Sequence, residues 1–183
     1  FVAKARKLAS ERVVGDPKST KTTQGPQIDE TQLNKIVELI ESGKKEGAKV
    51  EFGGKRVSGK GYFVEPTVFS GVTDNMRIAR EEIFGPVQQI LKFSTLEEVI
   101  ERANNTKYGL AAGIITNNIN VAMTFVQAVQ AGMVWVNQWE GNPVQMPFGG
   151  YKMSGQGREN GEEALHEYLE IKAVSFKLPV KNS

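Results

Sequence analysis

A short acidic and aromatic segment, Glu-Glu-Ile-Phe-Gly-Pro at 81–86, holds the side chains of this sequence that best suit ligand chemistry. A carboxylate such as that of Glu82 accepts hydrogen bonds from paired hydroxyls, and a ring such as that of Phe84 packs on a flat ring. The two together would suit a ribose diol and the ring it carries. The alternative is structural, because a Gly-Pro pair also ends a helix or turn and leaves the carboxylates in water. The residues alone leave both interpretations open.

A glycine-rich run at 148–161 invites comparison with a phosphate-binding loop. The comparison fails, because Asn160 stands where the dinucleotide fingerprint has glycine, no strand leads directly into the run, and no Gly-Lys-Ser/Thr follows. We interpret the run as a loop that needs unusual backbone angles. The only histidine, His166, has charged neighbours, which favours a solvated position over catalysis or metal binding. The sequence therefore predicts no metal site.

Composition excludes several classes of protein. The 183 residues carry a formal net charge of +2 and no long block of either sign, which argues against nucleic acid as a partner. No cysteine is present, so this chain supplies no disulfide, no cysteine zinc ligand and no cysteine nucleophile. The longest uncharged stretch, 108–139, is interrupted by Asn and Gln side chains. We therefore expect a buried layer there rather than a membrane span.

Apolar periodicity and capping residues predict the elements that must position these side chains. Asp29 with Gln32, and Thr95 with Glu98, form capping boxes ahead of apolar stripes at helical spacing. Pro66 interrupts one strand and predicts that it lies at a sheet edge. We expect helices before Gly15 and at 29–43, 95–103, 118–132 and 162–168, and strands at 49–52, 63–69, 87–93, 110–115 and 133–137.

The order of these elements predicts an α/β fold. From 87 onward, strands and helices alternate with short connections, which is typical of a parallel sheet flanked by helices. After residue 168, apolar and charged residues alternate and the apolar parity switches midway, as in an extended strand with a bulge. Too few neighbouring strands are predicted here, so we expect this terminal strand to join another chain or an absent segment. The first helix has no capping residue, which suggests a piece of a longer protein.

Four segments together resemble the aldehyde dehydrogenase superfamily. They are Glu-Glu-Ile-Phe-Gly-Pro at 81–86, Asn-Asn-Thr-Lys-Tyr-Gly-Leu-Ala-Ala at 104–112, Val-Trp-Val-Asn at 134–137 and Pro-Phe-Gly-Gly-Tyr-Lys-Met-Ser-Gly-Gln-Gly-Arg-Glu at 147–159. The resemblance covers essentially the whole chain and is nearest to the tetrameric cytosolic and mitochondrial NAD-dependent members, including retinal-oxidising ones. It implies the C-terminal part of the catalytic domain at 1–153, a loop and helix returning toward the coenzyme domain at 154–168, and an oligomerisation strand and tail at 169–183.

The resemblance also implies a reaction. In this family a cysteine thiolate attacks an aldehyde, a hydride passes to the nicotinamide, and a glutamate-activated water releases the carboxylic acid from a thioester. The nucleophile and the base match positions upstream of residue 1, so no catalytic residue is expected here and the isolated chain is expected to be inactive. The implied coenzyme is NAD, with NADP as the alternative. The implied partners are an aldehyde and further copies of the chain, in a dimer or tetramer built through the C-terminal strand. The implied location is cytoplasmic, with the mitochondrion as the alternative.

Individual residues take their implied roles from the same resemblance. Glu82 matches the glutamate that holds the nicotinamide ribose hydroxyls, and Phe84 matches the aromatic that packs near the nicotinamide. Gln32 and Lys35 match positions on the adenosine side of the coenzyme.

On the substrate side, Phe148 matches an aromatic of the pocket, and Trp139 falls in the same loop. Asn142 stands where acetaldehyde-type enzymes often have an aromatic residue, which implies a wider or more polar mouth. Arg158 and Glu170 resemble a charged pair that ties the late loop to the intersubunit strand.

Two further functions stay open as alternatives. A catalytically silent structural relative, like the lens crystallins that resemble this family, would need no ribose grip, so the presence of Glu82 and Phe84 favours the enzyme. An independently folding interaction module fits poorly with the unpaired terminal strand and the incomplete first helix.

Overall fold

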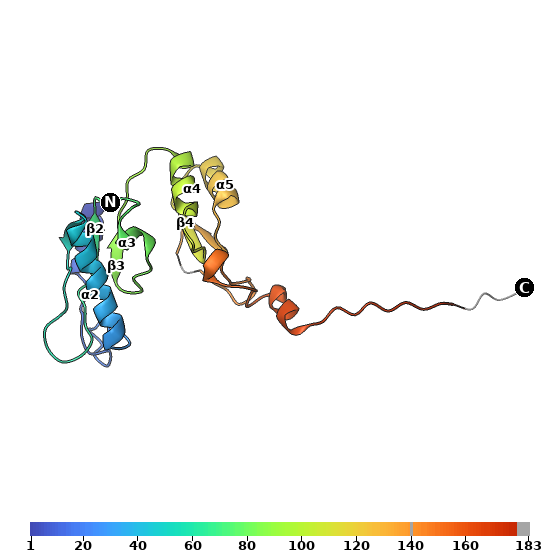
Figure 1. The fold of residues 1–183 in the computed structure, drawn as a ribbon, viewed down its shortest axis with the longest axis horizontal. Helices are drawn as coiled ribbons and strands as arrows, with labels where there is room; N and C mark the ends of the chain where they lie inside the picture. Colours follow the sequence, from blue (N-terminus) through green and yellow to red (C-terminus); the bar gives the residue numbers. More distant parts are fainter. Residues whose placement is uncertain (140, 179–183) are drawn as a thin grey trace, which may run out of the picture. The chain divides into compact units, whose positions relative to one another are not determined.

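A computed structural model describes residues 1–139 and 141–178, which belong to two compact units, 1–94 and 95–183 (Figure 1). The boundary between the units, at Ser94, falls inside residues 1–153, which the resemblance assigns to the C-terminal part of the catalytic domain. Unit 1 contains α1 (Val2–Ser10), α2 (Glu30–Lys45), β1 (Lys49–Phe52), β2 (Thr67–Ser70), α3 (Arg77–Arg80) and β3 (Val87–Gln89). Unit 2 contains α4 (Leu96–Asn104), β4 (Ala111–Ile114), α5 (Ile119–Ala128), β5 (Met133–Val136) and the 3₁₀ helices η1 (Lys152–Ser154) and η2 (Glu162–Tyr168).

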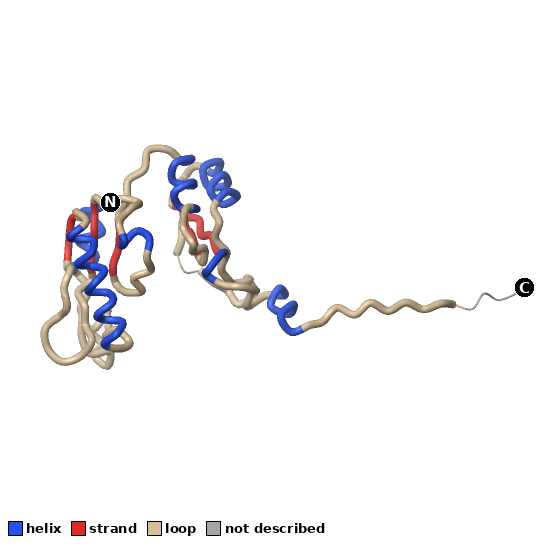
Figure 2. The backbone as a smooth tube through the Cα atoms, in the orientation of Figure 1, coloured by secondary structure: helices blue, strands red, loops and turns tan. Residues whose placement is uncertain are grey.

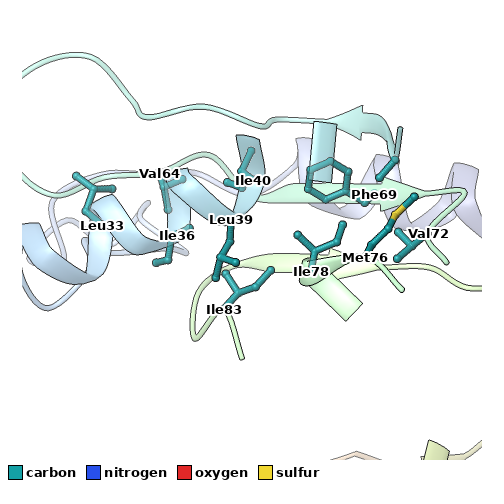
Figure 3. Close-up of a cluster of buried hydrophobic side chains, with 11 residues drawn as sticks. Leu33, Ile36, Leu39, Ile40, Val64, Phe69, Val72, Met76, Ile78 and Ile83 are labelled. Carbon is teal, nitrogen blue, oxygen red and sulfur yellow. The ribbon is translucent and has the colours of Figure 1, made fainter. Parts of the chain in front are cut away.

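The helix α2 organises the core of unit 1. Asp29 caps it as expected, with its Oδ1 accepting the backbone N–H of Gln32 at 2.8 Å. The reciprocal half of the predicted capping box does not form, because the side chain of Gln32 bonds to the carbonyl oxygens of Ile83 and Phe84 instead. The apolar stripe of the helix then faces the sheet, where it packs against Phe69 and the segment that follows β2 (Figure 3). The fully buried side chains of this stripe are Leu33, Ile36, Leu39 and Ile40.

The three strands of unit 1 form one sheet in the order β1-β2-β3 (Figure 2). Strand β1 is antiparallel to β2, and β3 is parallel to β2. The expectation that Pro66 marks an edge strand is wrong, because β2 is central and begins at Thr67, just after the proline. Pro66 therefore occupies a position where no ladder hydrogen bond is required of it.

In unit 2, strands β4 and β5 form a parallel pair with Gly113 opposite Trp135. The strand–helix–strand order from 110 onward is thus confirmed, whereas β3 pairs with β2 rather than continuing the same ladder. Asn118 is the cap of α5, since its Oδ1 accepts the backbone N–H groups of Asn120 and Val121. The buried apolar side chains of the unit belong to Ala122, Phe125, Val129, Ala131, Met133 and Trp135.

The glycine-rich run packs on the amino ends of β4 and β5. The carbonyl of Gly109 accepts the backbone N–H of both Gly132 and Tyr151, at 3.0 and 2.8 Å. A Cβ on Gly132 would lie only 1.7 Å from the carbonyl oxygen of Gly149, so this approach is open to glycine alone.

The C-terminal segment differs from its prediction. Residues 169–178 form no strand, and the expected helix at 162–168 is the 3₁₀ helix η2. Such a strand requires a partner for its backbone groups, and within the described part of the chain none pairs with it. Its apolar side chains, including the fully exposed Ile171, face solvent.

Candidate active site

The segment 82–85 is fastened to the first turn of α2 by one side chain. Gln32 donates from Nε2 to the carbonyl oxygens of Ile83 and Phe84, both at 3.0 Å. Its own backbone N–H is fixed by Asp29. The capping turn and the segment therefore move together, although they lie 51 and 52 residues apart in the sequence.

The same segment turns the ring of Phe84 outward. Ile83 anchors it with 5% of its surface exposed, whereas Phe84 is 72% exposed and has a φ of 52°. A left-handed backbone at a bulky residue costs about 1–3 kcal/mol and occurs preferentially at functional positions. Gly85 follows where a Cβ would lie 2.5 Å from Cδ1 of Ile36, so the backbone sits tightly on α2. The ring of Phe84 is thus exposed to solvent, while the backbone that carries it packs closely on α2.

The two acidic residues of the segment have different surroundings. Arg77 donates from Nε and Nη2 to the carboxylate of Glu81 at 2.8 and 3.0 Å, and from Nη1 to Glu38 at 3.0 Å. Hydrogen bonds to Glu81, and then to Glu38, raise the pKa of Arg77 above its ordinary value. Glu82 is exposed and makes no hydrogen bond or ion pair with any residue that the structure describes. Glu81 therefore stabilises α3, whereas the carboxylate of Glu82 is exposed and unpaired in the described structure.

Lys35 lies one turn after Gln32 on α2, and its side chain is exposed. No contact joins it to the segment 82–85 in the described structure. The ion pair of Arg77 with Glu81 was not predicted from the sequence, although a spacing of four residues is the signature of a helical ion pair.

The predicted substrate residues of unit 2 occupy separate places. Trp139 is 64% exposed. The centroid of its ring lies 4.8 Å from that of Trp135, and the two ring planes make an angle of 55°. The indole Nε1 of Trp135 donates to the carbonyl of Gly141 at 2.9 Å, which fixes the loop that follows β5. Asn142 is exposed on this loop.

Phe148 lines a cavity of about 660 Å³ together with Arg158 and the glycine-rich run. Its backbone exchanges hydrogen bonds with Glu159 at 2.7 and 2.8 Å. Trp139 and Asn142 are not among the residues that line this cavity. The structure thus brings Phe148 and Arg158 together.

The guanidinium of Arg158 is used within its own loop. It donates from Nη1 to the carbonyl oxygens of Gly150 and Gly157, at 3.2 and 2.6 Å, and lies over the ring of Tyr151 at 5.5 Å. Glu170 is exposed, and no ion pair joins it to Arg158 within the described chain. The predicted charged pair therefore stays a prediction for an assembly of several chains.

Within residues 1–139 and 141–178, no group of three or more His, Asp or Glu side chains could hold a metal ion. His166 lies on the surface, with its Nε2 3.8 Å from Oε2 of Glu163. No helix in these ranges has the length and apolar character that crossing a membrane requires.

Comparisons with solved structures find the same fold. The NAD⁺ complex of aldehyde dehydrogenase from Bacillus cereus is 48% identical with a TM-score of 0.92, over 94% of this chain and 35% of that one. Indole-3-acetaldehyde dehydrogenase from P. syringae, with NAD⁺ and IAA bound, is 42% identical with a TM-score of 0.94, over 97% of this chain and 36% of that one.

Curated sequences extend the similarity to the whole chain. Aldehyde dehydrogenase, cytosolic 2, of Macroscelides proboscideus is 60% identical over all 183 residues, which span 76% of that protein. Retinal dehydrogenase 2 of Homo sapiens is also 60% identical, and the chain spans 35% of its length. The sequence model of the aldehyde dehydrogenase family matches residues 1–174 of this chain. With the exposed Phe84 ring and the unpaired Glu82 carboxylate in place, these matches show that the chain belongs to the aldehyde dehydrogenase family.

Proposed function

We propose that this chain forms the part of an NAD-dependent aldehyde dehydrogenase that holds the nicotinamide end of the coenzyme and one wall of the substrate pocket. The observation that carries the proposal is the fastening of the segment 82–85 by Gln32. It presents an exposed ring and an unpaired carboxylate side by side on a rigid base.

These residues fit the coenzyme. The carboxylate of Glu82 accepts hydrogen bonds from the ribose hydroxyls, and the ring of Phe84 packs on the flat nicotinamide. Gln32 commits Nε2 to the backbone of the segment, which leaves its Oε1 to accept a hydrogen bond from the adenosine side. Lys35 lies one turn further along α2, on the same side of the coenzyme. NAD rather than NADP is supported by the NAD⁺ complexes of two relatives.

The proposed reaction is oxidation of an aldehyde to a carboxylic acid through a cysteine thiohemiacetal and thioester. Bound NAD accepts the hydride. This chain contains no cysteine, so the nucleophile comes from polypeptide outside these 183 residues. By the family resemblance we place the general base there as well. Its own residues orient the coenzyme and shape the pocket, and we expect the chain alone to be inactive.

Unit 2 supplies the substrate wall in this proposal. Trp139 and Phe148 offer aromatic surface to an aldehyde, and Asn142 widens the mouth or makes it more polar. The proposed division has catalytic-domain structure at 1–153, a return toward the coenzyme domain at 154–168, and the oligomerisation strand at 169–183.

Assembly and location complete the proposal. The exposed apolar side chains of 169–178 are suited to pair with another copy of the chain, which would give a dimer or tetramer. Two relatives are named cytosolic, which supports a cytoplasmic location.

The competing function is that of a catalytically silent structural relative. The strained backbone at Phe84 and the unpaired Glu82 favour the enzyme, because a structural role requires neither. The residues immediately upstream of Phe1 discriminate between the two functions: an enzyme has a cysteine there, and a silent relative has lost it.

The substitution Glu82→Gln in the complete enzyme tests the proposal. It removes the charge that grips the ribose, so the nicotinamide is held less firmly. Because small displacements from the reactive geometry are costly, we expect the hydride step to slow by about 100-fold. Single-turnover formation of NADH measures that step directly.

A matched control is Glu101→Gln, which removes an exposed carboxylate of α4 that has no partner in the described structure. Its single-turnover rate should equal that of the unmodified enzyme. An unaltered rate in the Glu82→Gln enzyme would contradict the ribose-binding role.

A further inference from the structure

At the carboxyl edge of the β4–β5 pair, one side chain joins the two strand ends just before Trp139. At the end of β5, Asn137 adopts a φ of 57° and so turns the chain back toward β4. Its side chain accepts the backbone N–H of Thr116 at 2.8 Å and donates to the carbonyl of the same residue at 2.9 Å. Both strand exits are therefore tied together directly below the loop.

Against this edge, the ring of Trp139 lies on Gly113. A Cβ built on Gly113 would be 3.2 Å from Cζ3 and 3.3 Å from Cε3 of the ring, closer than the 3.5–4.0 Å of relaxed carbon contacts. The carbonyl of Trp135, at 3.6 Å, would be in ordinary contact. The absence of a side chain at 113 thus lets the indole lie as deep as it does.

The environment of the ring decides what an added methyl group would displace. Trp139 is 64% exposed, so its ring can move outward, whereas the backbone around Gly113 is not crowded. A strand also gains nothing intrinsically from glycine, which is less favourable there than alanine. Glycine at 113 therefore favours one position of the indole rather than the stability of β4.

We propose that Gly113 is a positioning residue that sets the depth of the Trp139 ring and thereby the bulk of the aldehyde that the enzyme accepts. This inference rests on the proposed function, in which Trp139 faces the substrate. With an alanine at 113, the ring must move away by a few tenths of an ångström. In the proposal this shift is toward the space that a bulky aldehyde would occupy, whereas a small aldehyde does not reach the ring.

The first experiment measures Gly113→Ala in the complete enzyme with one small and one bulky apolar aldehyde. We expect KM for the bulky aldehyde to rise by about tenfold, the lower range for one misplaced methylene in an apolar pocket. The kcat for both aldehydes and the KM for the small one should stay unchanged.

The second experiment asks whether the effect passes through the indole. In the Trp139→Leu background the six-membered ring that meets the added methyl group is gone. Gly113→Ala should then have no further effect on KM, so the double-mutant cycle shows coupling of the full size of the first effect.

A spectroscopic signature checks the ring position without activity. The 183-residue chain contains two tryptophans, and their tilted rings are close enough for an exciton couplet in far-ultraviolet circular dichroism. We expect Gly113→Ala to reduce the couplet and to leave the urea midpoint unchanged. Gly25→Ala, where a Cβ would be in ordinary contact at 3.8 Å, should change neither.

The outcomes separate the two proposals. If Trp139→Leu leaves KM unchanged for every aldehyde, the substrate role of Trp139 fails, and with it this part of the proposed function. If Trp139→Leu changes KM but Gly113→Ala does not, or if the effect of Gly113→Ala persists without the indole, the positioning role of Gly113 is overturned. A lowered urea midpoint would also overturn it, by making the role of Gly113 structural.

Discussion

At the residue scale, Gln32 shows how one side-chain amide determines the position of a binding segment. It donates to two consecutive carbonyl oxygens, of Ile83 and Phe84, and no backbone ladder replaces these bonds. Phe84 can keep its strained φ because the carbonyl groups before and after its Cα, those of Ile83 and Phe84, are both held by Gln32.

We predict that Gln32→Met destabilises unit 1 and weakens coenzyme binding. Methionine keeps the length of the side chain but removes the donor from both carbonyls. Water can replace it at the exposed carbonyl of Phe84, whereas the loss at the half-buried carbonyl of Ile83 costs about 1–3 kcal/mol. Urea unfolding measures the loss of stability, and fluorescence titration of the complete enzyme measures the Kd for NAD.

Asn34→Met provides the comparison, because Asn34 is exposed on the same helix and its side chain has no hydrogen-bond partner among the described residues. Its unfolding midpoint and Kd should match those of the unmodified protein. Equal values for the Gln32→Met protein would show that the two hydrogen bonds do not fix the segment.

The sequence predicted some of these roles and not others. Glu82 and Phe84 stand in a recognisable motif, so the sequence alone predicts their role, which stays a prediction. The bonds of Gln32 could not be predicted, because its acceptors are 51 and 52 residues away and are backbone groups without a sequence signature. The unequal use of Glu81 and Glu82 likewise depends on where Arg77 lies in the fold.

At the element scale, helix starts were predictable and strand extents were not. Asp29 and Thr95 cap their helices as expected, because a cap is a local interaction between residues three apart. The strands expected at 63–69 and 87–93 are observed as Thr67–Ser70 and Val87–Gln89. A strand ends where its partner ends, and that partner is not encoded locally.

The docking of the glycine-rich run on β4 and β5 leads to a prediction for Gly132→Ala. The new Cβ would overlap the carbonyl oxygen of Gly149, a backbone atom that cannot turn aside as a side chain does. The run must then leave the strand ends, at a cost of about 3 kcal/mol, the upper range for overpacking. Hydrogen exchange of the Tyr151 amide and urea unfolding report the change.

Gly113→Ala serves as the control in the same unit, because the atoms it meets belong to an exposed ring. It should leave the urea midpoint in place. A Gly132→Ala protein as stable as this control would mean that the run does not pack on the strand ends in solution.

At the scale of the whole molecule, the proposed division gives this chain binding surfaces and leaves the reacting groups to polypeptide outside it. The chain spans about a third of several curated relatives that it matches, for example 35% of retinal dehydrogenase 2 of Homo sapiens. We therefore predict that purified 183-residue protein forms no NADH from propanal and NAD. Absorbance of NADH measures this, and turnover by the isolated chain would refute the proposed division of labour.

Assembly gives the second prediction at this scale. Glu170 is exposed in the single chain, while Arg158 lies against carbonyl groups of the glycine-rich run. If both meet at an interface between copies, Glu170→Lys strands the arginine at a cost of about 3 kcal/mol or more when the site is buried, and less than about 1 kcal/mol when it is exposed. We expect smaller assemblies in sedimentation and a weaker Kd for NAD in the complete enzyme.

Unchanged sedimentation and NAD affinity in the Glu170→Lys enzyme would contradict the predicted pair of Arg158 with Glu170.

The apolar side chains of 169–178 also bear on how the protein is made. Ile171 is fully exposed and Phe176 is 83% exposed in the single chain, within a segment whose backbone groups have no ladder partner in the described structure. A newly synthesised copy therefore presents the kind of surface that chaperones bind and that drives aggregation. In the proposed assembly, this surface is covered once a second copy binds. Soluble yield should consequently depend on how soon two nascent copies meet, and translation on closely spaced ribosomes should favour it.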